Sequence, residues 1–239
     1  MNVLELRDVT IHAGAGALRG VGLSVAPGQR VALVSTEQEL VTRLVRVCAG
    51  LDAPASGQVR LWGTDMGASP RGEVLHARHR LGYVLAEAGV FANMSFFDNL
   101  ALILRYLTED PEDAIAGRVH AHLAAWDLSE LAQVRASTAV PALQKRLAYA
   151  RATVHEPELL LSEDPSALLD PSGRRLVVAA HRRHGAAGGT SLVADDDLSF
   201  VGAWADRVVV FRDATVAYDG PMDGLPPRLR AELDDGGQP

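Results

Sequence analysis

Lysine is almost absent from this chain: among 239 residues, Lys145 is the only one. Cysteine is as rare, because Cys48 stands alone, which excludes an internal disulfide and fits a reducing compartment. No apolar run approaches the ~20 residues that a membrane-spanning helix needs. The N-terminal residues also lack the basic and apolar segments of a signal peptide. We therefore expect any membrane role to depend on a partner.

Basic side chains are outnumbered by acidic ones, and the formal net charge is −7. A nucleic-acid-binding surface is rich in lysine and arginine, so we expect no nucleic-acid partner. The hydrophobic share of 48% and the charged share of 22% are those of a soluble globular protein. A chain of this length buries a substantial core, as one domain or as one domain with a subdomain.

The stretch most indicative of chemistry is 157–171. Three leucines in a row predict a strand buried on both faces of a parallel sheet, and Glu163 and Asp164 follow at its end. Ligands collect at the carboxyl ends of such strands. The stretch resembles the Walker B and D-loop region of the ATP-binding subunits of ABC transporters, although that family places Asp before Glu, the reverse of this chain. The matched positions include Pro165, Asp170 and Pro171.

A second segment has the layout of a phosphate-binding loop, with a strand at Arg30–Ser35, a short connection and a helical pattern over Glu39–Ala49. The P-loop pattern is Gly-x-x-x-x-Gly-Lys-Ser/Thr, in which glycine backbone groups surround the phosphates and the lysine neutralises them. In the same register, this chain has Ser35 and Leu40 at the glycines, Val41 at the lysine and Thr42 at the hydroxyl that binds magnesium.

Only Thr42 suits that chemistry. Glu37 and Glu39 place negative charge where a triphosphate would lie, and two such charges repel by about 1 kcal/mol even in water. Arg43 stands two residues past the lysine position, roughly 200° around a helix. We therefore expect a strand, turn and helix that no longer hold phosphate.

The segment after the next strand, Arg80–Leu85, resembles the Q-loop, with Ala86 where the family has the glutamine that contacts magnesium and the attacking water. The region Val90–Tyr106 is better matched. Within it, the run Phe97–Leu100 and the apolar helix that ends at Tyr106 resemble the lipid-transport branch of the Mla/MCE type. In the family this region touches the membrane subunit, so we expect it to dock a permease. The expected docking residues are Phe91, Phe96 and Phe97. For Phe96 and Phe97, ordinary core packing is the alternative.

The helix Gln144–Ala152 matches the helix that follows the family's signature loop, but the loop itself, Leu-Ser-Gly-Gly-Gln in the family, is Ala139–Leu143 here. The serine hydroxyl is missing, and Pro141 removes a backbone donor. Asp196 stands at the position of the family's switch histidine. With its two acidic neighbours, it offers either a metal site or a cap for a helix that begins near Leu198.

The resemblance implies an α/β fold of the P-loop NTPase-like ABC ATPase type, with a mostly parallel sheet, antiparallel N-terminal strands and an inserted helical subdomain. We expect the cassette domain to span 1–225, with the helical subdomain at about 88–155, and a polar C-terminal tail at 226–239. In this family, each ATP lies between the Walker A motif of one cassette and the signature loop of the other. The expected partners are therefore a transmembrane permease subunit and a second ATP-binding cassette, either another copy of this chain or a different protein.

The nucleotide-handling positions depart from the family's pattern, whereas the fold-bearing segments keep it. We therefore interpret the chain as a degenerate cassette, a pseudo-ATPase with a structural or regulatory role. It would be cytoplasmic and bound to a permease at the inner face of the cell membrane. No catalytic residue, cofactor or metal is expected. Glu163, Asp164 and Asp196 would be vestiges of catalysis, and Ser35, Leu40, Val41, Thr42 and Ala86 vestiges of the nucleotide site.

Two alternatives are compatible with the sequence. The first is an active or slow ATPase with divergent motifs, which would use ATP and magnesium, with Thr42 and Glu163 as metal ligands. Phosphoryl transfer depends on positioned positive charge, which argues against this alternative. The second is a soluble regulator that no longer belongs to a transporter.

Overall fold

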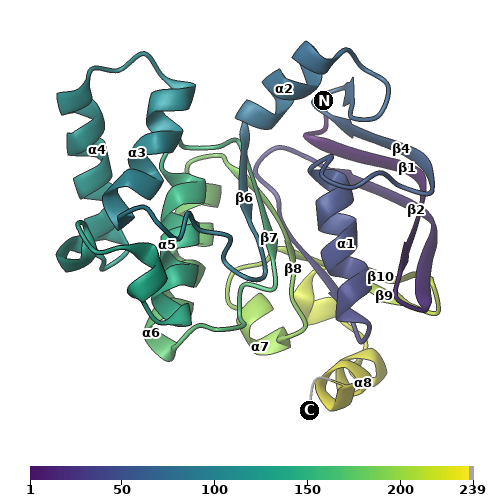
Figure 1. Ribbon diagram of the computed structural model, residues 1–239. Helices are drawn as coiled ribbons and strands as arrows, with labels where there is room; N and C mark the ends of the chain where they lie inside the picture. The colour runs from purple at the N-terminus through teal and green to yellow at the C-terminus, as the bar shows by residue number, and fades with distance from the viewer. Residues whose placement is uncertain (237–239) are drawn as a thin grey trace.

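The computed structural model describes residues 1–236, so the last three positions of the expected tail lie outside the described residues. Its largest element is a six-stranded sheet in the order β10-β9-β3-β8-β7-β6 (Figure 1). The strands from β9 to β6 are parallel to one another, and β10 pairs antiparallel with β9. Their bounds are Arg30–Ser35 (β3), Leu81–Val84 (β6), Leu159–Glu163 (β7), Thr190–Ala194 (β8), Arg207–Arg212 (β9) and Thr215–Gly220 (β10).

A second sheet has four antiparallel strands in the order β2-β1-β4-β5, which confirms the predicted antiparallel N-terminal strands. Buried and exposed side chains tend to alternate along β1 and β2, because only one face of this sheet is covered. The four strands span Leu4–Ala13 (β1), Gly16–Val25 (β2), Ser56–Leu61 (β4) and Thr64–Asp65 (β5).

Helix α1 (Gln38–Cys48) lies between the two sheets (Figure 1). Its apolar residues recur at helical spacing, so that Leu40, Leu44 and Val47 are buried together, and Cys48 is buried beside them. The chain turns out of the helix at Gly50, whose φ of +67° suits glycine. The helix begins one residue before the predicted start.

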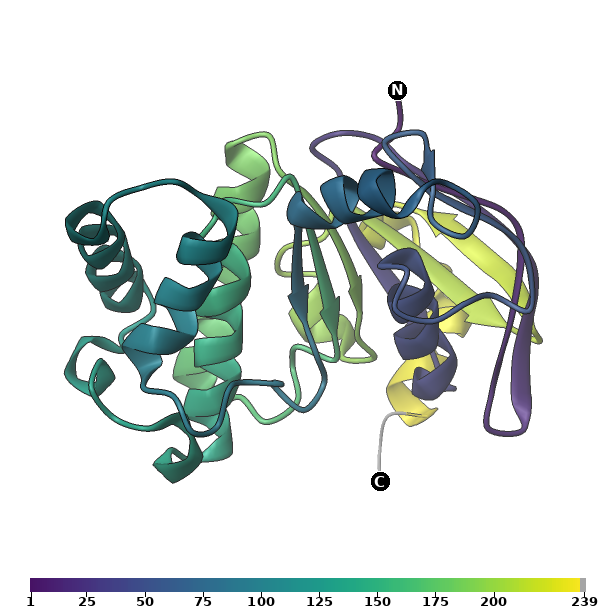
Figure 2. The same ribbon diagram turned by 45° about the horizontal axis from the view of Figure 1, so that its top comes forward.

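Helices α3 to α8 lie on the opposite face of the six-stranded sheet or at its margins, and Figure 2 shows α3 to α6 grouped on that face. The buried residue of α2, Ala77, instead packs in the apolar cluster of α1. Three helices, α3, α4 and α5, are inserted between β6 and β7, within residues 88–155. The helices span Arg71–His79 (α2), Phe96–Leu107 (α3), Glu112–Ala125 (α4), Pro141–Thr153 (α5), Pro171–Ala186 (α6), Leu198–Val201 (α7) and Pro227–Gly236 (α8). Short 3-10 turns lie at Ser129–Leu131, Ala136–Thr138 and Met222–Gly224.

The segment expected as a polar tail is helical in the described part. Helix α8 buries Leu233, of which 5% is exposed, in the same apolar cluster as Phe200 of α7. One apolar residue per turn is enough to anchor a short polar helix to the core.

Strand β7 is fully buried, as its three leucines predicted. Leu159 and Leu161 face α1, whereas Leu160 faces the helices on the other side. Because β3, β7 and β8 are parallel neighbours in the centre of the sheet, the segments that follow them lie at one edge. This edge carries the acidic residues and the altered phosphate loop.

Candidate functional site

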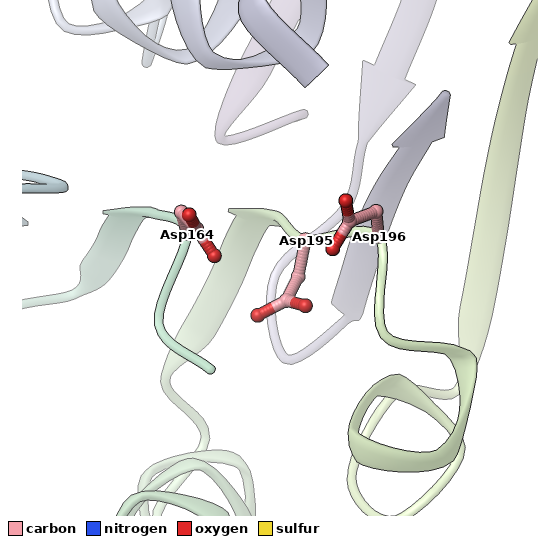
Figure 3. A group of neighbouring side chains, drawn as sticks. All are labelled: Asp164, Asp195 and Asp196. Atoms are coloured by element: carbon pink, nitrogen blue, oxygen red, sulfur yellow. The ribbon is translucent and has the colours of Figure 1, made fainter. Parts of the chain in front are cut away.

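The candidate site lies where β3, β6, β7 and β8 end. Figure 3 shows Asp164, which follows β7, beside Asp195 and Asp196, which follow β8. A cleft of about 760 Å³ lies elsewhere, and its lining includes Pro157 and Gly189, which precede β7 and β8. That cleft is therefore at the opposite edge of the sheet and does not belong to this site.

Glu163 is buried, with its carboxylate on the α1 side of β7, and its contacts account for both oxygens. The Tyr83 hydroxyl donates to Oε1, and Arg46 Nη1 lies 3.4 Å from the same oxygen. The backbone N–H of Ala86 donates to Oε2 at 3.1 Å. Burial and the neighbouring carboxylate both raise the pKa of Tyr83, so the phenol stays protonated and donates. Glu163 thus holds the end of β6 to the end of β7.

Ala86, at the position of the Q-loop glutamine, takes part through its backbone alone. Its carbonyl accepts a hydrogen bond from Lys145 Nζ at 2.8 Å, while its N–H is bound to Glu163. The chain turns back directly afterwards, with φ of +63° at Ala88 and +61° at Gly89. The loop is therefore fixed on both sides without the side chain that the family uses.

Sequence reasoning missed Lys145, which it assigned to the helix after the signature loop and to no part of this edge. The ammonium is fully buried, and it also donates to the carbonyls of Leu85 and Glu163 at 3.0 and 3.2 Å. Burial lowers the pKa of Lys145 to about 8, opposed by nearby carboxylates. Its uniqueness in the chain was the signal that pointed to it.

The three carboxylates of Asp164, Asp195 and Asp196 have oxygens within 4.8 Å of one another. Carboxylate oxygens at such spacing are able to hold a divalent cation. This set differs from the metal ligands expected in the active-ATPase alternative, because Glu163 is not part of it and its oxygens are used by Tyr83 and Ala86.

Asp195 is the most buried of the three acids. Burial raises its pKa to about 7, opposed by hydrogen bonds from Ser166 N at 2.8 Å and Ser166 Oγ at 2.9 Å. Asp197 caps α7 by accepting from Phe200 N at 3.0 Å, so the predicted helix cap is confirmed for that residue. Burial also raises the pKa of Asp164, whose φ of +41° is rare for a residue with a side chain.

The segment between β3 and α1 differs from the P-loop pattern. β3 ends at Ser35 and α1 begins at Gln38, so only two residues connect them. The positions of the second glycine and the lysine, Leu40 and Val41, lie inside α1 with at most 2% exposure. They face the core between the sheets, so these two positions offer a phosphate neither a glycine nor an ammonium.

Two carboxylates add to this misfit. A Cβ placed on Gly16 would lie 2.5 Å from Glu37 Oε2, and one on Gly14 would lie 3.0 Å from Glu39 Oε2, so both carboxylates lie against the hairpin between β1 and β2. Arg43 does not compensate them, because its Nε lies 3.8 Å from Asp52 Oδ2. No side chain among residues 1–236 caps the first turn of α1.

The signature and D-loop positions have structural roles. Pro141 is the first residue of α5, and Val140 precedes it without a side-chain oxygen to cap the helix. Asp170 caps α6 by accepting from Gly173 N, and it accepts from Arg146 of α5 at 3.0 Å through both oxygens. The match at Asp170 is thus explained by helix packing.

The expected docking residues differ in exposure. Phe96 is the first residue of α3 and is fully buried, which corrects its assignment to a docking surface. Phe97 is partly buried, with its ring centroid 5.2 Å from that of His120. Phe91 is 44% exposed, and Tyr106, at the other end of the region, is 65% exposed.

The fold and the site together define a P-loop-type cassette whose phosphate loop departs from the P-loop sequence pattern. The comparison with known families is unambiguous: the ABC transporter model matches residues 18–167, and the chain belongs to this family.

Relatives support the assignment over most of the chain. The chain is 30% identical to the phosphonates import ATP-binding protein PhnC of Stutzerimonas stutzeri, over 92% of this chain and 85% of the relative. It is 33% identical to the sulfate/thiosulfate import ATP-binding protein CysA of Methylococcus capsulatus, over 92% of this chain and 63% of that protein. It is 28% identical to the intermembrane phospholipid transport system ATP-binding protein MlaF of Escherichia coli K12, over 98% of this chain and 89% of that protein.

Solved structures agree on the fold. The dimeric cassette MJ0796, bound to ADP and Pi, matches with a TM-score of 0.82 at 19% identity, over 93% of this chain and 100% of that one. The cbiO1 subunit from Clostridium perfringens matches with a TM-score of 0.77 at 23% identity, over 98% of this chain and 92% of that one. These similarities confirm the predicted ABC ATPase fold.

Proposed function

We propose that this chain is a degenerate ABC cassette, a pseudo-ATPase that supports a permease complex without hydrolysing ATP itself. The carrying observation is the connection between β3 and α1. It is two residues long and includes Glu37, with Glu39 two residues further on in α1, and it leads into a helix whose Leu40 and Val41 are buried. A triphosphate needs backbone donors and positive charge at this place.

The proposed partners are a membrane permease and a second cassette, which is either another copy of this chain or a different protein. Within the described part of the chain, no helix is long and apolar enough to cross a membrane. The family supports the proposal, since PhnC, CysA and MlaF are ATP-binding proteins of import or transport systems and MJ0796 forms a dimer. The likeness to MlaF and the segment Val90–Tyr106 favour lipid transport. The proposed location is the inner face of the cell membrane.

The test is an equilibrium titration of the isolated protein with magnesium-ATP, followed by calorimetry and by thermal shift. We expect no binding at millimolar ATP, and hence no rise in melting temperature. MlaF of Escherichia coli, prepared in the same way, is the positive control. A dissociation constant in the micromolar range would contradict the proposal.

A slow ATPase is the second candidate, favoured by one observation. Asp164 is held in a left-handed conformation beside Asp195 and Asp196, and strained residues cluster at functional sites. The discriminating measurement is phosphate release by the isolated chain, with and without Asp164→Asn. Turnover that this substitution abolishes would establish the enzyme.

A further inference from the structure

The ammonium of Lys145 has an unusual set of partners. It donates to three backbone carbonyls, those of Leu85, Ala86 and Glu163, at 2.8 to 3.2 Å, which uses all three of its N–H groups. The side chain is 0% exposed. Burying a charge is costly unless it is paired and hydrogen-bonded, so this position is stable only if the surroundings stabilise a cation.

The carbonyls come from two segments, and no other side chain of α5 donates hydrogen bonds to both of them. Leu85 and Ala86 follow β6, and Glu163 ends β7, so Lys145 connects both to α5. The Glu163 carboxylate binds the Ala86 N–H from the other face of the sheet at 3.1 Å. The Lys145 ammonium and the Glu163 carboxylate therefore bind the same peptide group, the one that joins Leu85 to Ala86, from opposite sides.

The surroundings also carry a surplus of negative charge. The carboxylates of Asp164, Asp195 and Glu163 all favour the charged form of Lys145. Carboxylates this close repel one another, and more strongly inside a protein than in water. Arg46 lies near Glu163 on the α1 side, but it also pairs with Asp52 at 3.1 Å.

We propose that Lys145 is a built-in cation, which takes the role of a bound metal ion at this acidic edge and keeps the loop after β6 against β7 without nucleotide. This inference rests on the proposed function, because a cassette that does not bind magnesium-ATP needs another source of positive charge here. It adds a mechanism by which the edge stays assembled in a nucleotide-free subunit.

The first experiment compares Lys145→Met with the wild type by hydrogen–deuterium exchange of peptides that contain Ala86. The variant loses the buried cation, so we expect exchange at least about tenfold faster in this loop. Millimolar Mn²⁺ should restore the wild-type rate in the variant, because the uncompensated carboxylates then bind the ion. The wild type should show no response to Mn²⁺.

Arg151→Met is the matched control. Arg151 lies on the same helix and donates to the Gly89 carbonyl of the same loop at 2.8 Å, but no carboxylate influences its pKa, which burial lowers. This variant should loosen the loop near Gly89 without making it responsive to Mn²⁺. An equal Mn²⁺ response in both variants, or exchange in Lys145→Met that matches the wild type, overturns the proposal.

A second variant keeps the test decisive if Lys145→Met does not fold. The double substitution Lys145→Met with Asp164→Asn removes one negative charge together with the cation, and we expect it to recover folding and slow exchange. If the double variant is no better than the single one, charge compensation is not the role of Lys145. Tight Mn²⁺ binding by the wild type would also overturn the proposal that Lys145 takes the role of a metal ion.

The outcome is separable from that of the proposed function, because none of these readouts uses nucleotide. If the wild type binds magnesium-ATP while Lys145→Met shows the Mn²⁺-dependent loosening, the pseudo-ATPase proposal fails and the role of Lys145 stands.

Discussion

Arg46 Nη1 of α1 lies 3.4 Å from Glu163 Oε1 at the end of β7, on the side of the sheet opposite α5. The sequence argued against Arg43 as a replacement for the missing lysine, and Arg46 is the arginine of α1 that reaches the acidic edge. Asp52 accepts from Arg46 Nε at 3.1 Å. The guanidinium is therefore balanced by two carboxylates.

The contacts of Glu163 predict a structural cost when it is removed. Glu163→Ala leaves the Tyr83 hydroxyl and the Ala86 N–H without their acceptor, and we expect a loss of about 2–3 kcal/mol in the free energy of unfolding. Glu163→Gln keeps the shape and one acceptor, so it should cost less. Urea denaturation provides the measurement.

Glu158→Ala is the control for this prediction. Glu158 also pairs with an arginine, Arg80, but its side chain is 55% exposed, and such pairs contribute between 0 and about 1 kcal/mol. If Glu163→Ala is as stable as Glu158→Ala, the hydrogen bonds around Glu163 do not hold β6 to β7 in the way described.

Burial separates the phenylalanines that the sequence grouped as docking residues. Phe96→Ala should lower the free energy of unfolding by about 3–5 kcal/mol, because it leaves a cavity under α3. Phe91→Asp should leave the thermal melt near that of the wild type, and it should weaken co-purification with the permease. Leu75→Asp, at a position of α2 that is 42% exposed, is the surface control. Equal co-purification of the two Asp variants would remove Phe91 from the docking surface.

The sequence was sufficient to predict the elements whose pattern is local. The leucines of β7 predicted a buried strand, and Asp197 was within the acidic run expected to cap α7. It was not sufficient where partners are distant in the chain. Lys145 is 59 residues from Ala86 and forms its bonds only because α5 packs behind β6 and β7. No periodicity encodes such a contact.

The same limit applies to Phe96 and to the C-terminal segment. An aromatic pair followed by an apolar helix fits a core or a docking groove equally, and only the position of the Phe96 ring under α3 decides between them. Helix α8 looked like a tail because its composition is polar. Its anchoring depends on Leu233, which needs the far end of the core to be in place.

A further prediction concerns acid. His181 is fully buried, with Nδ1 3.0 Å from Ser191 Oγ and its ring stacked on Trp204, and burial lowers its pKa from 6.5 to about 3. At a pH between these two pKa values, His181 is therefore protonated in the unfolded state and neutral in the folded state. Stability should fall as the pH drops below about 6.5, by about 1.4 kcal/mol per pH unit for this residue.

Chemical denaturation at several pH values checks this prediction. His181→Gln keeps a side chain that can bond to Ser191 but cannot titrate, so its stability should depend less steeply on pH between 6 and 4. Burial lowers the pKa of His122 and His184 as well, so some acid sensitivity should persist. Identical slopes for the variant and the wild type would show that His181 is not the cause.

The last prediction concerns which chain hydrolyses ATP in the native complex. With a competent partner cassette, one composite site would combine the altered loop of this chain with the partner's signature loop. The other would combine the partner's own P-loop with Ala139–Leu143, where Pro141 begins α5. Only the second of these sites contains a Walker A lysine. We therefore predict that the ATPase activity belongs to the partner, while this chain sets the geometry of the pair.

The test uses the complex purified from its native membrane. Replacing the partner's Walker A lysine with Ala should reduce the ATPase rate to background, whereas Asp164→Asn here should change it by no more than about twofold. Asp164 is the better choice for this substitution, because Glu163 also holds Tyr83 and Ala86, and its loss would confuse a folding defect with a catalytic one. Size-exclusion chromatography of each variant checks assembly. If Asp164→Asn abolishes turnover in an intact complex, Asp164 is catalytic and the chain is an enzyme. If the partner proves to be a second copy of this chain, the complex should show no ATPase activity above background.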